Sequence, residues 1–374
     1  MLTWIEIDAA AIGRNLGAFR SVVTPGTAVM AVVKGNAYGH GLEVVAPLAA
    51  KHADWLGVNN LEEALAVRDL GIDKPVAILG HTEPERLDYV VAEEFRQVVY
   101  REDVAEGLSR SARDRRTTAR VHLKVETGTH RQGVAIGTLE SFVRFVHSLP
   151  NLEIEGVYTH FANIEDTLDP AFAQFQMDEF RRALTIVREA GARFSWVHAS
   201  ATSGALLYPE TGFNMIRVGI GAYGIWPSRE TQLVARERGR LISLTPALTW
   251  KTRIAQIKTV QPGQFVGYGL TFQARHPMKI AVLPIGYYDG YDRKLSNCGR
   301  VLAGGQAVPV IGRVMMNMIV IDVTHADVEP EDEVVLIGRQ GKSEIRIEEL
   351  AEKIGTIAYE VVSRINPAIP RIEQ

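Results

Sequence analysis

Short apolar segments alternate with amphipathic segments along the first two thirds of the chain. Eight apolar segments have the length and the bounding residues of β-strands. These predicted strands are Val29–Lys34, Trp55–Asn59, Val76–Leu79, Gln97–Tyr100, Arg120–Val125, Ile154–His160, Ser195–His198 and Met215–Gly219. Helix-like segments lie between them. One covers 61–70 and ends at Gly71, and another covers 171–191, with apolar residues mostly three to five apart.

Strands that alternate with helices indicate parallel pairing through right-handed crossovers. Eight such units within about 200 residues are typical of a (β/α)8 barrel. An open doubly wound sheet produces the same alternation and is the alternative at this point.

The pattern changes after residue 240, where period-two strands bounded by Gly or Pro replace the alternation. The predicted strands there are Leu248–Ile254, Lys279–Leu283, Val308–Ile311 and Val334–Gly338, followed by one helix over 347–365. We therefore predict an α/β fold: an N-terminal (β/α)8 barrel over residues 1–240 and a mostly β C-terminal domain over 241–374. The strand-like residues 1–10 are expected to pair with the second domain.

Composition excludes several classes of protein. The 374 residues are 46% hydrophobic and 23% charged, which is typical of a globular protein. The net charge is −3 and the basic residues form no long block, so we expect no nucleic-acid surface. No apolar run is long enough to cross a membrane, and the N-terminus lacks the pattern of a signal peptide. The single cysteine, Cys298, excludes a disulfide framework, so the expected location is cytoplasmic.

Lys34 is a candidate nucleophile because it closes an apolar strand at the barrel end where active sites lie. Partial desolvation there would lower the pKa of the amine and favour its neutral form, as in a Schiff-base lysine. A lysine that merely extends into solvent is the alternative, and position alone does not separate the two. The neighbouring Tyr38 could donate its hydroxyl to a phosphate, although isolated tyrosines are more often core residues.

A phosphate site is expected after the seventh and eighth strands, as in many barrels. The segment 217–224 contains the pattern G-x-G-x-x-G, but Pro227 would break the helix that a dinucleotide site requires. The hydroxyl-rich segment 198–203 could share this phosphate or could cap the following helix. No metal site is expected, because the ten histidines are scattered; His160 and His198 end different strands and could approach one another.

A Schiff-base lysine together with a phosphate site suggests pyridoxal phosphate, and the motifs then resemble one family over nearly the whole chain. The segment 31–41, AVVKGNAYGHG, resembles the cofactor-lysine signature of the alanine racemases, the fold-type III pyridoxal enzymes. The segments WIEID (4–8), RVGI (217–220) and IGYYDGY (285–291) stand in the order expected for that family. The resemblance implies a barrel followed by a β domain, assembled as a head-to-tail homodimer whose active sites are shared between chains.

The resemblance also implies roles for individual residues. Lys34 would bind pyridoxal 5'-phosphate and act as one catalytic base, and Tyr268 of the partner chain would be the opposing base. Arg131 would contact the phenolic oxygen of the cofactor, and Arg217 would face its pyridine nitrogen. His160 would order the tyrosine base through that arginine, and Lys124 matches a lysine that is carbamylated in some members. The implied phosphate-binding residues are Tyr38, Thr202, Gly219, Ile220 and Tyr359. The implied substrate contacts are Arg131, Met316 and, at the entrance, Tyr287.

The sequence departs from the family pattern at three places, and the first affects the expected specificity, because loss of a carboxylate beside the substrate could admit side chains other than methyl. The usual Val-Cys-Met-Asp-Gln is VMMNM at 314–318, which replaces a carboxylate by Asn317. His130 stands where a glycine usually precedes the cofactor arginine, and 199–203 reads ASATS.

The resemblance therefore implies the activity of the alanine racemase family, which interconverts L- and D-alanine, on a small amino acid, with a role in supplying D-alanine for peptidoglycan. The alternatives are a broad-specificity amino-acid racemase, a fold-type III decarboxylase and a non-catalytic pyridoxal-phosphate carrier.

Overall fold

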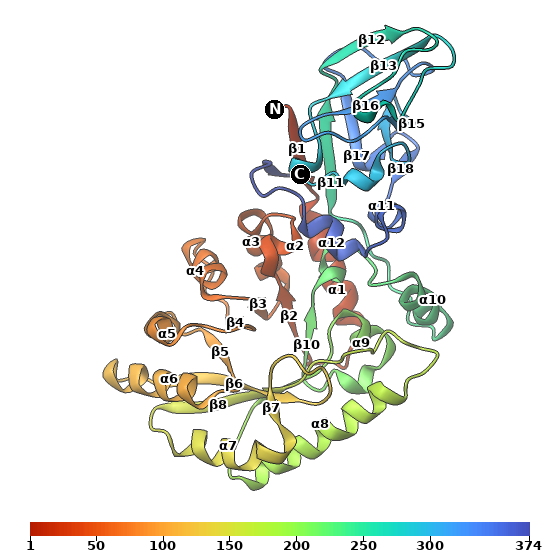
Figure 1. Ribbon diagram of the computed structural model, residues 1–374. Helices are drawn as coiled ribbons and strands as arrows, with labels where there is room; N and C mark the ends of the chain where they lie inside the picture. The colour runs from red at the N-terminus through yellow and green to blue at the C-terminus, as the bar shows by residue number, and fades with distance from the viewer. The chain divides into compact units, whose positions relative to one another are not determined.

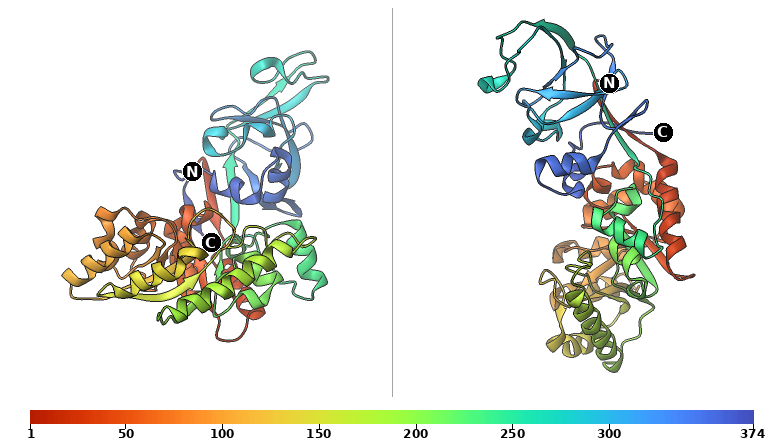
Figure 2. Two further views of the ribbon diagram at one scale, coloured as in Figure 1. Left: turned by 60° about the horizontal axis from the view of Figure 1, so that its bottom comes forward. Right: turned by 90° about the vertical axis from the view of Figure 1, so that its right-hand side faces the viewer.

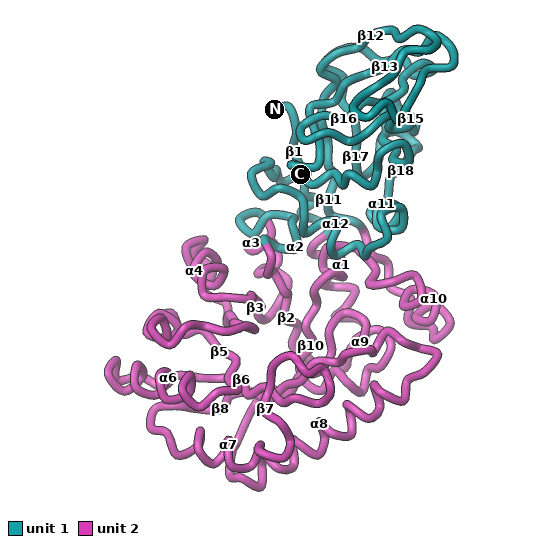
Figure 3. The backbone as a smooth tube through the Cα atoms, viewed as in Figure 1, with its two compact units in different colours: residues 1–11, 36–44, 246–374 teal, residues 12–35, 45–245 magenta.

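The structure is a computed structural model that describes residues 1–374. It divides into two compact units (Figure 3). One unit consists of residues 12–35 and 45–245, and the other of residues 1–11, 36–44 and 246–374. Residues 36–44 thus group with the C-terminal unit, although they follow Lys34 in a segment that the sequence pattern assigned to the barrel.

The first of these units contains eight parallel strands in consecutive order around a barrel (Figure 1). Most residues of these strands are buried, because one face meets the barrel interior and the other meets the surrounding helices. The strands are β2 (Ala28–Val32), β3 (Trp55–Val58), β4 (Val76–Ile78), β5 (Arg96–Val99), β6 (Ala119–Glu126), β8 (Leu152–Tyr158), β9 (Trp196–His198) and β10 (Met215–Val218). A short strand, β7 (Val134–Ala135), pairs with β6.

The strand order excludes the doubly wound alternative, because the last barrel strand, β10, pairs with the first, β2, and the strands from β2 to β9 pair in consecutive order. Side-chain and loop contacts join β9 to β10 in place of a regular ladder. Asn214 accepts from the Val197 N–H at 2.8 Å and donates to the Ser195 carbonyl at 2.6 Å. The Arg217 N–H donates to the Ser200 carbonyl at 3.0 Å. The predicted barrel is therefore confirmed.

Helices cover the outside of this barrel (Figures 1 and 2). Their capping follows the sequence: Asn60 and Ser228 accept from the backbone N–H groups of Glu63 and Thr231. The helices of the N-terminal region are α1 (Ala9–Val22), α2 (Lys34–Tyr38), α3 (Leu42–His52), α4 (Leu61–Asp69), α5 (Leu87–Ala92), α6 (Glu102–Asp114), α7 (Ile136–Ser148), α8 (Ala171–Glu189), α9 (Thr202–Leu207) and α10 (Arg229–Glu237). No helix of the structure has the length and apolarity needed to cross a membrane.

The C-terminal unit contains a ten-stranded, mostly antiparallel sheet, which confirms the predicted β-rich domain. The first strand of the chain, β1 (Thr3–Ile7), pairs with β11 (Leu248–Arg253) in this sheet and lies parallel to β19 (Arg371–Glu373). The remaining strands are β12 (Gln256–Val260), β13 (Met278–Leu283), β14 (Arg300–Ala303), β15 (Gln306–Ile311), β16 (Ile319–Asp322), β17 (Glu333–Gln340) and β18 (Ser343–Ile345).

The prediction of one helix over 347–365 was wrong. The structure has two helices, α11 (Ile347–Ile354) and α12 (Ala358–Ser363). Gly355 ends the first helix in the left-handed region with φ of 73°, and its N–H caps the carbonyls of Ala351 and Glu352. Apolar periodicity continues through this break, which is why the pattern suggested a single helix.

Candidate active site in the barrel

Lys34 follows the buried strand β2 and is partly buried at the C-terminal end of the barrel. Burial lowers the pKa of its amine, and the nearby cation Arg131 lowers it further. The carboxylate of Glu63 acts in the opposite direction. The direction of the shift is the one predicted from the strand end, and it favours a neutral, nucleophilic amine.

The backbone after Lys34 forms a left-handed turn. Gly35, Asn36, Ala37 and Tyr38 have φ values of 63°, 52°, 52° and 53°. Left-handed backbone costs about 1–2 kcal/mol for each residue with a Cβ atom, so neighbouring contacts must hold the turn. Asn36 supplies one such contact, because its side chain accepts from the Leu42 N–H at 2.8 Å. Sequence patterns indicated a glycine-rich turn here but not its handedness.

Glu63, a residue that the sequence analysis missed, fixes the start of this turn. Its carboxylate accepts from the Gly35 N–H at 2.6 Å and from the Asn59 N–H at 2.7 Å. The two amides follow the neighbouring strands β2 and β3. Glu63 therefore joins the ends of two strands next to Lys34, and its charge also opposes full neutralisation of the lysine.

Arg217 lies on β10 and is buried with 4% of its surface exposed. Its Nη1 contacts Nδ1 of His198 at 2.6 Å, and its Nη2 contacts Nδ1 of His160 at 3.2 Å. Nη2 also donates to the carbonyls of Thr159 and Ala199 at 3.0 and 2.7 Å, so its two hydrogens are shared among three acceptors. Burial lowers the pKa of Arg217 to about 10, so the guanidinium is still charged at neutral pH. The expected approach of His160 and His198 thus occurs through a shared arginine.

Both histidines are neutral in this environment. Burial, followed by the positive charge of Arg217, lowers the pKa of His160 and of His198 well below the usual value. A guanidinium only donates hydrogen bonds, so each Nδ1 that meets it must be an acceptor. The single hydrogen of each neutral ring is therefore on Nε2.

Tyr158, the last residue of β8, supports this arrangement and was also missed by sequence analysis. Its ring stacks on that of His198 with centroids 4.6 Å apart and planes at 5°. The guanidinium carbon of Arg217 lies 5.1 Å from the centroid of the same ring. A tyrosine at a strand end gave no signal by itself, because it resembles an ordinary core residue.

The predicted phosphate-binding residues of the barrel lie together after β9 and β10. The Gly219 N–H donates to the hydroxyl of Thr202 at 3.3 Å, and Thr202 is the first residue of α9. A Cβ atom on Gly221 would approach Thr202 Cγ2 to 2.8 Å, so the turn at 219–223 requires glycine there. Helix α10 begins only at Arg229, beyond Pro227, which agrees with the exclusion of a dinucleotide site.

Only one hydroxyl of the segment 200–203 is left for a phosphate. Ser200 hydrogen-bonds to Thr211, and Ser203 donates to Glu165 at 2.6 Å. Thr202 instead faces the Gly219 amide, and the buried Ile220 opens the short 3₁₀ turn that follows. The donors present, a hydroxyl beside backbone amides at a turn, suit a phosphate group.

Two further cations lie on the barrel near Lys34. Burial, followed by repulsion from Arg131, lowers the pKa of Lys124 to about 8. Lys124 Nζ lies 3.4 Å from the side-chain oxygen of Gln132 and 5.5 Å from the centroid of the Tyr158 ring. Arg131 itself is exposed, and its N–H donates to Glu126 at 3.2 Å. These cations favour a substrate or cofactor that carries negative charge.

The remaining predicted site residues belong to the C-terminal unit. The rings of Tyr38 and Tyr359 are 6.2 Å apart. Tyr268 is 72% exposed and opens a 3₁₀ turn at 268–270. Tyr287 and Met316 lie on adjoining loops, since the Tyr287 N–H donates to the Met315 carbonyl at 3.0 Å and the Tyr288 N–H to the Met316 carbonyl at 3.0 Å.

The functional groups of these barrel residues are suited to binding pyridoxal phosphate. They provide a partly desolvated lysine, a hydroxyl and amides for a phosphate, and a buried arginine with N–H groups to spare. An enzyme that uses an activated lysine at the top of a parallel barrel is the class that this fold and site define.

The comparisons with known proteins identify the family. The alanine racemase N-terminal domain matches residues 7–227, and the alanine racemase C-terminal domain matches residues 247–373. The chain is 40% identical to an alanine racemase of Syntrophobacter fumaroxidans over 97% of this chain and 95% of that protein. The chain belongs to the alanine racemase family.

Solved structures give the same result. Alanine racemase from Streptomyces lavendulae superposes with a TM-score of 0.93 at 32% identity, covering 100% of this chain and 97% of that one. The alanine racemase of Bartonella henselae, solved with covalently bound pyridoxal phosphate, superposes with a TM-score of 0.85 at 25% identity and covers all of both chains. The predicted family and fold class are therefore confirmed, and the protein is an enzyme of the racemase class.

Proposed function

We propose that the protein is a pyridoxal-phosphate-dependent alanine racemase that interconverts L- and D-alanine. The observation that carries the proposal is the arrangement around Lys34, Arg217 and Thr202 within a chain of this family. The cofactor, when bound, withdraws electrons from Cα of the substrate and makes its proton acidic. A role in supplying D-alanine for peptidoglycan is part of the same proposal.

Racemisation requires one group on each face of Cα, so that a proton leaves from one side and returns on the other. Lys34 would serve one face, because its amine is partly desolvated and surrounded by other cations. Tyr268, supplied by the partner chain of a homodimer, would serve the other. Its high exposure within its own unit supports a role at an interface between chains.

The other residues would hold the cofactor and the substrate. Arg217 keeps its Nε hydrogen and the second Nη1 hydrogen for the pyridine nitrogen, because its other N–H groups already have partners. Being a cation that stays protonated, it gives that nitrogen no proton, which would limit side reactions such as transamination. The residues proposed to bind the phosphate are Tyr38, Thr202, Gly219, Ile220 and Tyr359. Those proposed to contact the substrate are Arg131, Met316 and Tyr287.

His160 would link Arg217 to the tyrosine base. Its Nδ1 accepts from Arg217, so its Nε2 hydrogen is available to a phenolic oxygen. This assigns His160 a positioning role beside the cofactor.

Chiral chromatography after incubation of the cofactor-loaded protein with single L-amino acids tests the function. D-alanine as the main product supports the proposal. Comparable products from serine, lysine and arginine would instead establish a broad-specificity racemase. That alternative is favoured by the exposed Asn317, which replaces a carboxylate. Absence of any D-product would contradict both and favour decarboxylation or carriage.

A variant of Tyr268 tests the two-base assignment. Tyr268→Phe should abolish racemisation but keep the exchange of the Cα hydrogen of one enantiomer with D2O, because Lys34 still serves its own face. Mass spectrometry of recovered L- and D-alanine measures this exchange. Equal exchange of both enantiomers, or none, would contradict the assignment.

A further inference from the structure

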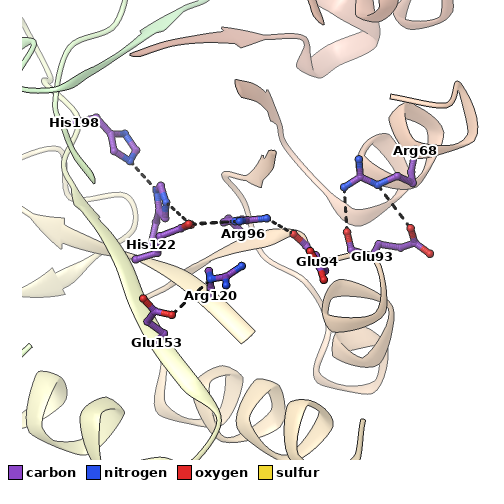
Figure 4. Close-up of polar contacts among 9 residues, drawn as sticks. Arg68, Glu93, Glu94, Arg96, Arg120, His122, Glu153 and His198 are labelled. Carbon is purple, nitrogen blue, oxygen red and sulfur yellow. Dashed lines mark hydrogen bonds and ion pairs between the residues drawn. The ribbon is translucent and has the colours of Figure 1, made fainter. Parts of the chain in front are cut away.

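Polar side chains form a continuous series through the interior of the barrel, from Arg217 toward the opposite end of the strands. His198, at the end of β9, contacts Arg217 through Nδ1 and His122 through Nε2, the latter at 2.9 Å. Nε2 of His122 lies 3.6 Å from Oε2 of Glu155. Figure 4 shows the two histidine rings pointing toward one another from different strands.

The far end of this series is a partly buried ion pair. Glu155 on β8 accepts from Nε of Arg96 at 3.0 Å, and Arg96 is the first residue of β5. Arg96 also donates to the Glu94 carbonyl at 2.7 Å (Figure 4). Burial raises the pKa of Glu155, but the nearby His122 and the hydrogen-bonded Arg96 outweigh it and lower the pKa to about 2, so Glu155 carries a negative charge at neutral pH.

Aromatic rings surround the middle of the series. Trp55, the first residue of β3, lies 5.3 Å from the His122 ring and 5.7 Å from Trp196 between ring centroids. The guanidinium of Arg96 lies 5.5 Å from the centroid of the Trp55 ring. His122 and His198 are both fully buried. Bulk water does not reach these rings, so their polar atoms depend on the neighbours inside the barrel.

The direction of each hydrogen bond in the series follows from Arg217, because its guanidinium can only donate. Arg217 donates to His198 Nδ1, so the His198 hydrogen is on Nε2 and donates to Nδ1 of His122. The hydrogen of His122 must then be on its own Nε2. That atom has no hydrogen-bond partner within normal distance, and the nearest acceptor is the ionised Glu155. All donors thus point away from the guanidinium and toward the carboxylate.

We infer that Glu155 and His122 are positioning residues for Arg217: the carboxylate stabilises the same tautomers of both histidines that the guanidinium requires, and His198 in turn holds the guanidinium in place. The inference rests on the proposed function, in which Arg217 faces the pyridine nitrogen of the cofactor. If His122 carried its hydrogen on Nδ1 instead, His198 would have to accept on Nε2 and carry its own hydrogen on Nδ1. That hydrogen would face the N–H of Arg217, and the hydrogen bond between the two residues would be lost.

Packing of β8 holds His122 in the orientation that the series requires. A Cβ atom on Gly156 would approach three atoms of the His122 ring to 2.9 Å. Gly156 has no left-handed backbone, so Gly156→Ala displaces the ring without straining the strand or removing a polar group.

The unaltered protein provides the first test. Neutron diffraction on the cofactor-loaded enzyme, exchanged into D2O, locates hydrogens on ring nitrogens directly. We expect deuterium on Nε2 of His198 and of His122 and none on either Nδ1. Deuterium on Nδ1 of His198 would overturn the inference, whether or not any variant folds.

Two variants test the consequence for the cofactor. Glu155→Gln removes the charge and leaves one of the donors from Arg96 and His122 without an acceptor, and Gly156→Ala shifts His122. Both should change the absorption spectrum of the bound cofactor and lower kcat about tenfold, with KM for alanine within about twofold, because Arg217 faces the cofactor and not the substrate.

Glu153→Gln is the matched control. Glu153 lies on the same strand and pairs with Arg120 at 3.6 Å, but both side chains are exposed (Figure 4). We expect its spectrum and kcat to equal those of the unaltered enzyme. If Glu155→Gln behaves like Glu153→Gln, the inference is wrong while the proposed function stands. If the unaltered protein racemises no amino acid, the proposed function is wrong, and the neutron result still decides the order of the hydrogen bonds.

Discussion

At the scale of single residues, the barrel converts ordinary side chains into unusual ones through burial and neighbouring charge. Lys34, which is partly buried, and Lys124, which is buried, both have a lowered pKa because of this burial and the nearby cations. Arg217 remains charged but is held by two neutral histidines and two carbonyls. The chemistry therefore depends on where each residue lies in the fold as much as on its type.

Replacement of Lys34 should abolish covalent attachment of the cofactor, even if the cofactor still binds non-covalently. Lys34→Arg retains the positive charge but cannot form a covalent bond with an aldehyde at neutral pH. We expect no covalent cofactor in the intact mass after borohydride reduction and a loss of racemase activity of about 10⁴-fold or more. Lys124→Arg serves as the control and should retain the covalent adduct. A reduced adduct of unchanged yield on Lys34→Arg would show that another residue binds the cofactor.

The Glu155 ion pair should make stability depend on pH. The pKa of Glu155 is about 2 in the fold, against an ordinary value of 4.5. A carboxyl whose pKa is depressed on folding stabilises the protein above its unfolded pKa, and this contribution is lost as the pH falls toward the folded value. In urea unfolding, the free-energy difference between the unaltered protein and Glu155→Gln should therefore be largest near pH 7 and shrink below pH 4.5. A difference that grows on acidification would contradict this assignment.

At the scale of elements, glycine decides where helices end and where backbone turns can form. Gly355 separates α11 from α12 because it adopts a left-handed conformation that closes the first helix. Gly17, by contrast, lies inside α1 with ordinary helical backbone and open space around its Cα. Glycine is thus required by the backbone conformation at position 355 but not at position 17.

Alanine substitutions at these two glycines should shift stability in opposite directions. Gly355→Ala should lower the free energy of unfolding by about 1 kcal/mol, because a Cβ atom disfavours the left-handed region. Gly17→Ala should raise it by about 0.5–1 kcal/mol, because alanine favours helix and restricts the unfolded chain. Chemical denaturation of both variants measures the changes. A stabilised Gly355→Ala would mean that the chain continues as one helix there.

At the scale of the whole molecule, the proposed active site would combine residues from two chains. Lys34 belongs to the barrel unit and Tyr268 to the C-terminal unit, where its side chain is mostly exposed. In a symmetric homodimer, each site would combine Lys34 of one chain with Tyr268 of the other.

Mixing of two inactive variants tests this sharing. Lys34→Ala and Tyr268→Phe chains, unfolded together and refolded in equal amounts, should recover about a quarter of the normal activity, because half of the dimers are mixed and each contains one intact site. Each variant refolded alone is the control and should stay inactive. If both residues of a site came from one chain, the mixture would recover no activity.

Much of this protein was predictable from local patterns. The eight barrel strands followed from apolar runs bounded by turn residues, since a strand buried on both faces must be apolar throughout. The shifted Lys34 amine followed from its position after such a strand. The family followed from short motifs around that lysine.

Tertiary structure decided the features that join distant parts of the chain. The series from Arg217 through His198 and His122 to Glu155 connects four strands, β10, β9, β6 and β8, and neither histidine has a sequence signal that names the other as its partner. The left-handed turn after Lys34 likewise depends on contacts from Glu63 and Asn36. Periodicity records which face of an element is buried, whereas the choice of partner across the barrel is made only when the strands pack.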